Sequence, residues 1–187
     1  MTVLLTLVSH GPTAATWRAG FPADEPLKAG SLPQRQRAPW RGRRVLTSPR
    51  LACLETAARL ALTALPDDGL ADMDYGRWSG LDLDSVAAAE PGALQRWISD
   101  PGFHEHGGES RAGLALRMAA WLDRLQGAGG HTVAITHAAV IKSLILHVLD
   151  APEAGFWRLD IAPGTATELR HDGRRWAVST LNCPLPE

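Results

Sequence analysis

Two short apolar runs, each followed at once by a histidine, constrain the fold of this chain more than any other feature. The run Val3–Val8 leads to His10, and the run Val133–Thr136 leads directly to His137. Runs of this length and apolarity, bounded by loop-forming residues, predict buried strands of a mainly parallel sheet. Ligands of open α/β sheets bind beyond the carboxyl ends of such strands. We therefore expect both imidazoles in one crevice, the alternative being two unrelated loop histidines.

Helical patterns alternate with the predicted strands. Apolar residues at helical spacing predict helices over residues 48–65, 83–98, 109–126 and 138–149, the second interrupted at Pro91. Further strands are expected over residues 44–47, 165–170 and 176–181. Residues 20–44 show no clean period and are expected to form a long loop. The pattern predicts a single domain over residues 1–187, an α/β three-layer sandwich with a central mostly parallel sheet and helices on both faces.

The balance of charge argues against several classes of function. The 187 residues include 19 basic and 20 acidic side chains, which gives a formal net charge of -1 and argues against a general binder of nucleic acid.

No apolar run reaches the roughly 18 residues of a membrane span, and the first residues lack the pattern of a signal peptide. The two cysteines, Cys53 and Cys183, fit a reducing compartment. We therefore expect a cytoplasmic protein that acts on a small molecule, and whether it forms a homodimer is left open.

Ser48 and Pro49 have the residue types that begin helices, with Ser48 as N-cap and Pro49 as the first helical residue. Free backbone N–H groups and the helix dipole would form an anion site there, with Arg50 in the first turn. An anion site that faces two histidines is typical of phosphoryl chemistry. In such chemistry one histidine attacks the phosphorus, and the other donors hold the phosphoryl oxygens.

Five segments carry motifs in a recognisable order: Ser9–Thr13, Ser48–Ala57, Leu70–Gly80, Gly107–Ser110 and Ile135–Ile141. In this order, and over nearly the whole chain, they resemble the motifs of the histidine phosphatase superfamily, in its phosphoglycerate-mutase-like branch. Any one of the five is weak, but five in sequence order are specific. The resemblance implies a phosphoglycerate-mutase-like fold and phosphomonoester hydrolysis that needs neither a metal nor another cofactor.

The resemblance also implies roles for individual residues. His10 would be the nucleophile that takes up the phosphoryl group, and His137 would stabilise that group during transfer. Asp72 stands where the family has a proton-donating Glu, and its side chain is one methylene shorter. The candidates for contacts with the substrate are Ser9, Gly11, Thr13, Arg18, Arg50, His106, Glu109 and Ala138.

Two departures from the family pattern concern the binding of phosphate. Ser9 and Ala52 stand where the family has arginines, which hold phosphoryl oxygens through bidentate bonds. Electrostatic groups of this kind are each typically worth about 10²–10³ in rate. Arg50 and Arg18 are the candidates to replace them, the alternative for each being a solvated arginine.

Three functions therefore remain open. The first is a phosphatase with relocated arginines that works through phospho-His10. The second is a repurposed biosynthetic enzyme that uses His10, His137 and Asp72 for acid–base chemistry on a non-phosphate substrate. The third is a non-catalytic member of the family that binds a ligand or a protein.

Overall fold

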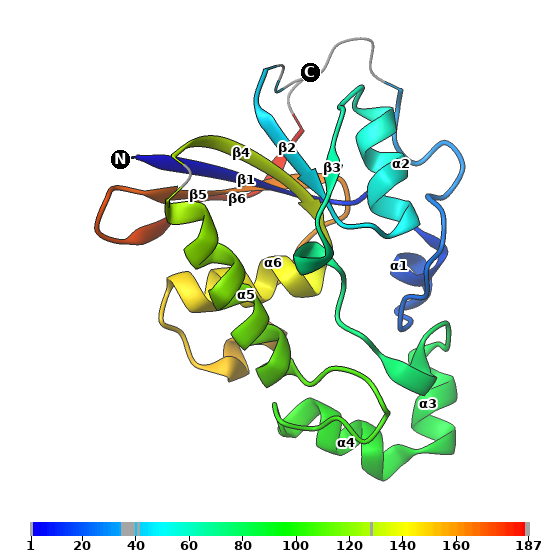
Figure 1. Ribbon diagram of the computed structural model, residues 1–187. Coiled ribbons are helices and arrows are strands. Elements are labelled where there is room, and N and C mark those ends of the chain that lie inside the picture. Colours follow the sequence, from blue (N-terminus) through cyan, green and yellow to red (C-terminus); the bar gives the residue numbers. More distant parts are fainter. Residues whose placement is uncertain (1, 35–39, 41, 128, 186–187) are drawn as a thin grey trace.

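The computed structural model describes residues 2–34, 40, 42–127 and 129–185 (Figure 1). Within them a sheet of six strands has the order β3-β2-β4-β1-β5-β6. The strands are β1 (Val3–Ser9), β2 (Arg44–Thr47), β3 (Leu65–Pro66), β4 (Gly130–Thr136), β5 (Thr165–His171) and β6 (Trp176–Pro184). The pairings among β3, β2, β4 and β1 are parallel, whereas β5 and β6 pair antiparallel. The sheet is thus mixed and mostly parallel, as the sequence predicts.

Alternate residues of β1 face two separate cores. Leu5 and Leu7 pack in one core with helices α5 (Arg111–Gln126) and α6 (Ala138–Val148). Val8 packs in the other core, with residues of helix α2 (Leu51–Arg59). In Figure 1, α5 and α6 lie below the sheet and α2 lies beside its other face. The prediction of helices on both faces is therefore confirmed.

The helix predicted over residues 48–65 is shorter in the structure. Helix α2 begins after Arg50, because the Ser48 N–H still donates to the Ile135 carbonyl oxygen of β4 at 2.8 Å and so continues the strand pairing. The Ser48 hydroxyl accepts from the Arg50 N–H at 3.2 Å, which makes a turn ahead of the helix rather than a cap. The helix ends where Ala61 adopts a positive φ of 53° and the Leu62 N–H bonds back to Ala57. The residues that follow form β3.

The remaining helices follow the predicted pattern more closely. Helices α3 (Leu83–Ala89) and α4 (Pro91–Ser99) divide at Glu90, with Pro91 in the first turn of α4. Ser110 caps α5, its hydroxyl accepting from the Gly113 N–H at 3.0 Å. Short 3₁₀ turns cover Asp68–Leu70, Gly76–Trp78 and Glu153–Arg158.

The long loop after β1 contains a short helix, α1 (Ala14–Arg18), which the sequence analysis did not predict. An isolated bridge between Thr13 and Leu27 closes the loop on itself, and a second one, between Gly20 and Asp82, joins it to the residue before α3. The loop thereby reaches the carboxyl ends of β1 and β4. Residues 22–25 of this loop line the cavity that holds the candidate active site.

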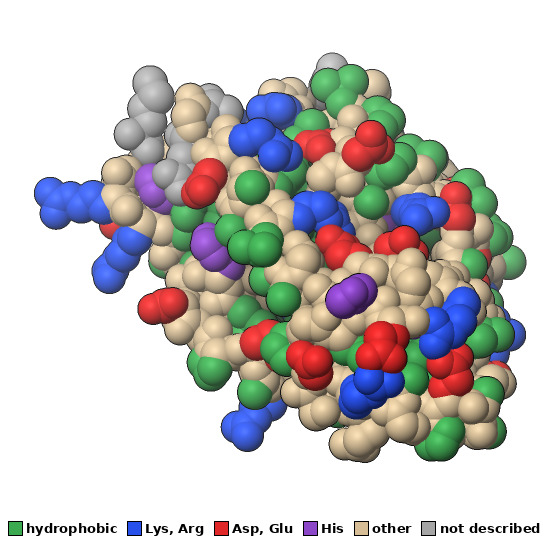
Figure 2. Space-filling view, turned by 60° about the horizontal axis from the view of Figure 1, so that its bottom comes forward, with side chains coloured by type: hydrophobic (Ala, Val, Ile, Leu, Met, Phe, Trp, Pro, Cys, Tyr) green, Lys and Arg blue, Asp and Glu red, His purple; other side chains and the backbone are tan. Residues whose placement is uncertain are grey.

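Two observations bear on the expected classes of partner. No helix of the described part of the chain is long and apolar enough to cross a membrane. The face shown in Figure 2 carries Lys and Arg side chains interspersed with Asp and Glu, rather than one broad basic area. On that face the charge pattern is therefore unlike the basic footprint of a nucleic-acid binder.

Candidate active site

The parallel pairing of β1 with β4 brings the two histidines together. Ser9 pairs with Thr136 at the end of the ladder, and the His10 N–H donates to the Thr136 carbonyl oxygen at 3.0 Å. The rings of His10 and His137 have centroids 5.0 Å apart and planes at 64°. Both residues are buried, with exposed fractions of 7% and 5%. The register of two neighbouring strands thus joins residues that lie far apart in the sequence.

The His10 ring is held with one nitrogen directed to the cavity. Its Nδ1 lies 2.7 Å from the carbonyl oxygen of Gly11. Because a carbonyl oxygen only accepts, Nδ1 carries the proton and Nε2 keeps its lone pair. Burial, followed by the nearby His137, lowers the pKa of His10 from 6.5 to about 4. At neutral pH the imidazole is therefore uncharged and has a free nitrogen lone pair.

In the His137 ring it is Nε2, rather than Nδ1, that is bound within the protein. Its Nε2 lies 2.9 Å from the Ser48 hydroxyl and 3.4 Å from the Cys53 sulfur. Ser48 Oγ already accepts from the Arg50 N–H, so its hydroxyl hydrogen is free to go to Nε2, and Nδ1 then carries the ring proton. Burial, then the charges of Arg50 and Arg117, lower the pKa of His137 to about 3. His137 is thus a neutral donor.

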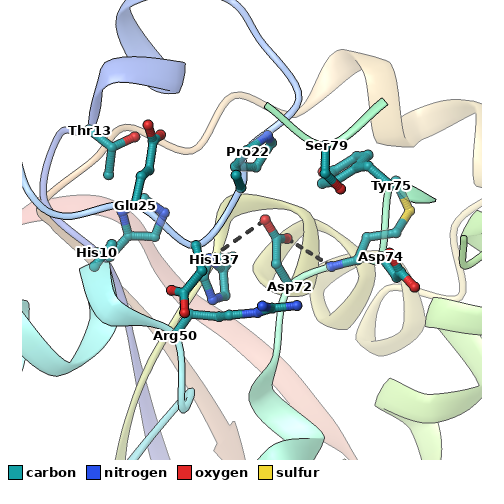
Figure 3. Close-up of a pocket in the computed structure, with 14 residues that line it drawn as sticks. His10, Thr13, Pro22, Glu25, Arg50, Asp72, Asp74, Tyr75, Ser79 and His137 are labelled. Atoms are coloured by element: carbon teal, nitrogen blue, oxygen red, sulfur yellow. Dashed lines mark hydrogen bonds and ion pairs between the residues drawn. The ribbon is translucent and has the colours of Figure 1, made fainter. Parts of the chain in front are cut away.

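The donor nitrogen of His137 faces Asp72. The distance from Nδ1 to Asp72 Oδ2 is 3.6 Å, and Nδ1 has no hydrogen-bond partner among the described residues (Figure 3). The other carboxylate oxygen of Asp72 accepts from the Met73 N–H at 2.9 Å. Burial is the main cause that raises the pKa of Asp72 from 3.8 to about 6. The carboxyl group of Asp72 is therefore still partly protonated in weakly acidic solution, as a proton donor must be.

Arg117 of α5 fixes the segment that carries Asp72. Its guanidinium donates to the carbonyl oxygens of Gly69 at 2.9 Å, Ala71 at 3.0 Å and Asp72 at 3.4 Å. It also pairs with the Glu109 carboxylate at 2.7 and 2.9 Å. Glu109, a predicted substrate contact, is thus bound to Arg117 and lines a neighbouring hollow. Sequence reasoning missed Arg117, which lies on α5 and pairs with Glu109, just ahead of the Ser110 cap of that helix.

A cavity of about 130 Å³ opens in front of the two histidines. Five residues singled out from the sequence line it, together with Ala52: His10, Thr13, Arg50, Asp72 and His137. Arg50 is the one arginine of this lining among the described residues, and Figure 3 shows it beside Asp72.

The other sequence-predicted residues lie outside the lining. Ser9 is 2% exposed at the end of β1, and Ala138 packs against a core at the start of α6. Gly11 supports the site through its backbone, since its N–H donates to the Thr56 hydroxyl at 3.0 Å. Arg18 lines a separate surface groove with Trp17 and Lys28. His106 is buried, with its ring against Trp78 and Phe103.

Sequence reasoning missed three carboxylates of the lining. We call Asp24, Glu25 and Asp74 the outer wall of the cavity, and His10, Asp72 and His137 its inner wall. Asp24 and Asp74 are exposed and Glu25 is half-buried, whereas the inner wall is almost closed to solvent. Asp24 and Glu25 belong to the aperiodic loop, so no helical or strand pattern marked them.

The fold and the site together define a class: an α/β protein in which two histidines and a carboxyl meet at the ends of parallel strands. The sequence model of the histidine phosphatase superfamily (branch 1) matches residues 5–184. The chain therefore belongs to the histidine phosphatase superfamily.

Relatives and solved structures agree with this assignment. A protein of Mycobacterium tuberculosis named as bifunctional is 37% identical over 123 residues, 63% of this chain and 34% of that protein. The chain thus spans about a third of the length of that relative. Phosphoserine phosphatase 1 of Hydrogenobacter thermophilus is 25% identical over 142 residues, covering 73% of this chain and 67% of that one.

Among solved structures, a mycobacterial glucosyl-3-phosphoglycerate phosphatase in complex with VO3 has a TM-score of 0.80 at 24% identity, covering 96% of this chain and 98% of that one. A phosphoserine phosphatase of Entamoeba histolytica has a TM-score of 0.81 at 20% identity, with 96% of each chain covered. These likenesses establish the fold, which is that of phosphoglycerate-mutase-like proteins.

Proposed function

We propose that the protein hydrolyses phosphomonoesters of a small molecule through a phosphohistidine on His10. The observation that supports it most is the state of His10. Its Nδ1 is bound to the Gly11 carbonyl oxygen, so the lone pair of Nε2 is free toward the cavity. A neutral imidazole with a free lone pair is a competent nucleophile.

The proposed reaction has two steps. In the first, His10 Nε2 attacks the phosphorus and forms the P–N bond while the P–O bond to the alcohol breaks. The proton on Asp72 passes to the leaving oxygen, and the alcohol departs. In the second, the Asp72 carboxylate takes a proton from water, whose oxygen attacks the phosphorus. The P–N bond breaks, and phosphate and neutral His10 are released.

His137 would stabilise the group that is transferred. Its Nδ1–H points toward the space beside Asp72 Oδ2 and has no partner in the described part of the chain. A phosphoryl oxygen placed there would accept this hydrogen bond, and Arg50 would supply a positive charge from the same lining. Arg50 thus takes part of the role of the arginines that Ser9 and Ala52 replace.

The test is a panel of phosphomonoesters that includes an aryl phosphate, phosphoserine and glucosyl-3-phosphoglycerate. We expect release of phosphate by the unaltered protein and none by His10→Ala. Rapid acid-free quenching should trap a phosphorylated peptide that contains His10. If no ester is hydrolysed and no phosphohistidine forms, phosphatase chemistry is excluded.

A second candidate is acid–base chemistry on a substrate without phosphate, with His10, Asp72 and His137 as the acid and base groups. The observation that favours it is the acidic outer wall, which disfavours a dianion. It predicts binding of uncharged or cationic small molecules without any phosphohistidine. A non-catalytic member of the family would bind such a ligand and leave it chemically unchanged, even with His10 present.

A further inference from the structure

We propose that the cavity selects phosphomonoesters whose alcohol part carries an ammonium group, and that the outer wall binds this cation. The substrate would then be a zwitterion, with its phosphoryl group at the inner wall and its ammonium group near Asp24, Glu25 and Asp74. This inference rests on the proposed function and deepens it by naming the chemical class of the substrate.

The charges around the cavity do not suit a simple dianion. Four carboxylates line it, those of the outer wall and Asp72, against the single guanidinium of Arg50 in the described lining. His10 and His137 add no positive charge near neutral pH, because burial lowers the pKa of both. A phosphate dianion alone would therefore enter a negatively charged space. A substrate that brings its own cation removes this conflict.

Among the described residues, no other arginine lines this cavity. Ser9 and Ala52 occupy the two positions of the family arginines, and both side chains are uncharged. The Arg117 guanidinium is already bound to the Glu109 carboxylate and to three carbonyl oxygens. Arg18 lines another groove. The missing positive charge is therefore expected on the ligand.

The carboxylates of the outer wall are held in position before any ligand arrives. One oxygen of Asp24 accepts from the Leu51 N–H at 2.7 Å, one of Glu25 from the Ala15 N–H at 2.8 Å, and one of Asp74 from the Gly76 N–H at 2.9 Å. Asp24 thereby occupies the start of α2, where the sequence predicted that the anion of a ligand would bind. Each carboxylate keeps a second oxygen, which is suited to accept from an ammonium group.

An independent observation places the other end of the ligand. His137 is 5% exposed, and its Nδ1 has no hydrogen-bond partner among the described residues although it borders the cavity. A buried donor without a partner points to a polar group that is supplied from outside. A phosphoryl oxygen at this point would lie against the inner wall. The organic part of the molecule would then extend toward the outer wall.

The complementary cation is organic rather than metallic. The described residues contain no group of three or more His, Cys, Asp or Glu side chains arranged to hold a metal ion. Pro22, Met73 and Tyr75 line the same cavity and supply apolar surface for the carbon chain of a ligand. A short aminoalkyl phosphate fits these requirements.

The experiment compares two esters of the same length, O-phosphoethanolamine and 2-hydroxyethyl phosphate, which differ in the ammonium group. We expect kcat/KM to be about tenfold higher for phosphoethanolamine, mostly through KM, because charge pairs at a partly exposed site contribute of this order. The ratio should fall in concentrated salt, which screens such pairs. Equal values for the two esters in an active enzyme would overturn the inference and leave the proposed function intact.

Three variants locate the cation. Asp24→Asn, Glu25→Gln and Asp74→Asn keep an oxygen for the backbone N–H and remove the charge, so each should lower the ratio several-fold. Asp84→Asn is the matched control, because Asp84 is an exposed carboxylate that does not line the cavity. An unchanged ratio in all three variants would contradict the assignment.

Binding to His10→Ala keeps the inference testable if no ester is hydrolysed. Calorimetry should give a lower Kd for phosphoethanolamine than for 2-hydroxyethyl phosphate, and Asp74→Asn in the same background should reduce the difference. Equal Kd values would overturn the inference. A lower Kd for phosphoethanolamine, together with no hydrolysis by the unaltered protein, would support the inference and exclude the proposed hydrolysis.

Discussion

The inner and outer walls of the cavity face each other but differ in burial, in support and in origin. His10 and His137 come from the ends of two paired strands and are almost fully buried. Asp24 and Glu25 come from a loop, and Asp74 from an irregular segment, and these side chains are wholly or partly exposed. The inner wall combines two neutral imidazoles with one carboxyl group, whereas the outer wall consists of carboxylates alone. The fold thus positions the two walls by different means, strand pairing for the histidines and loop structure for the carboxylates.

The largest effect should come from the inner wall itself. His10→Ala removes the nucleophile, and removal of such a group typically lowers kcat by about 10⁴ or more. Phosphate release under saturating substrate measures the effect. His104→Ala is the control, because His104 is exposed and does not line the cavity. Residual turnover within tenfold of the unaltered protein would show that His10 is not the nucleophile.

The pH dependence should report the two titrating groups of the inner wall. The pKa of His10 is about 4 and that of Asp72 about 6. Since His10 must be unprotonated and Asp72 protonated, kcat/KM should rise through pH 4, peak near 5 and fall about tenfold per unit above 6. Asp72→Asn should lower the rate by about 10²–10⁴ and abolish the fall above pH 6. A profile that keeps rising to pH 8 would contradict the role of Asp72 as the acid.

Arg117 tests how the inner wall is held. Arg117→Ala removes the hydrogen bonds to the segment of Asp72, and misplacement of a catalytic group by about 1 Å can cost about 10²-fold in rate. We expect kcat to fall more than KM changes, and the limb of the pH profile assigned to Asp72 to shift.

Arg117→Lys should restore part of the rate, because Lys retains the charge but not the planar fork of donors. Arg124→Ala, on the same helix, is the control and should leave kcat and the pH profile unchanged. If Arg117→Ala alters thermal unfolding but neither kcat nor the profile, the arginine is only structural.

The smallest expected effect comes from making the cavity more like that of the family. Ala52→Arg adds a positive charge to the lining, opposite the excess of carboxylates. Binding of inorganic phosphate should tighten by about tenfold, the value of one favourable charge pair of about 1.4 kcal/mol. Calorimetry measures the change, and Ala52→Gln controls for side-chain size. Unaltered phosphate affinity would mean that the outer wall does not limit anion binding.

Much of the fold follows from local patterns of the sequence. The strands that hold the histidines were predicted because short apolar runs are bounded by loop residues, and α6 was predicted from its apolar spacing. The predicted end of α2 was wrong, because residues 60–65 look apolar enough to continue a helix. The backbone turns at Ala61 instead, and Leu65–Pro66 pairs with β2.

The candidate site was predictable in part. The sequence alone pointed to His10, His137 and Asp72, because the histidines follow strands and Asp72 lies within a motif. It gave no sign of Arg117, which acts through backbone carbonyls 45 to 48 residues away in the chain. It also singled out His106 and Ala138, whose side chains pack elsewhere in the protein.

The sequence by itself determined where the two histidines of the inner wall lie, since a buried strand followed by a histidine specifies both the element and the side chain at its end. Only the tertiary structure decided which charged side chains these histidines face. Asp24 and Glu25 reach the cavity because the loop after β1 is held by the bridges of Thr13 with Leu27 and of Gly20 with Asp82. Such pairings join distant segments, and no local period encodes them. The positions of the charged side chains around the cavity therefore depend on the tertiary structure, whereas the net charge of -1 follows from the sequence alone.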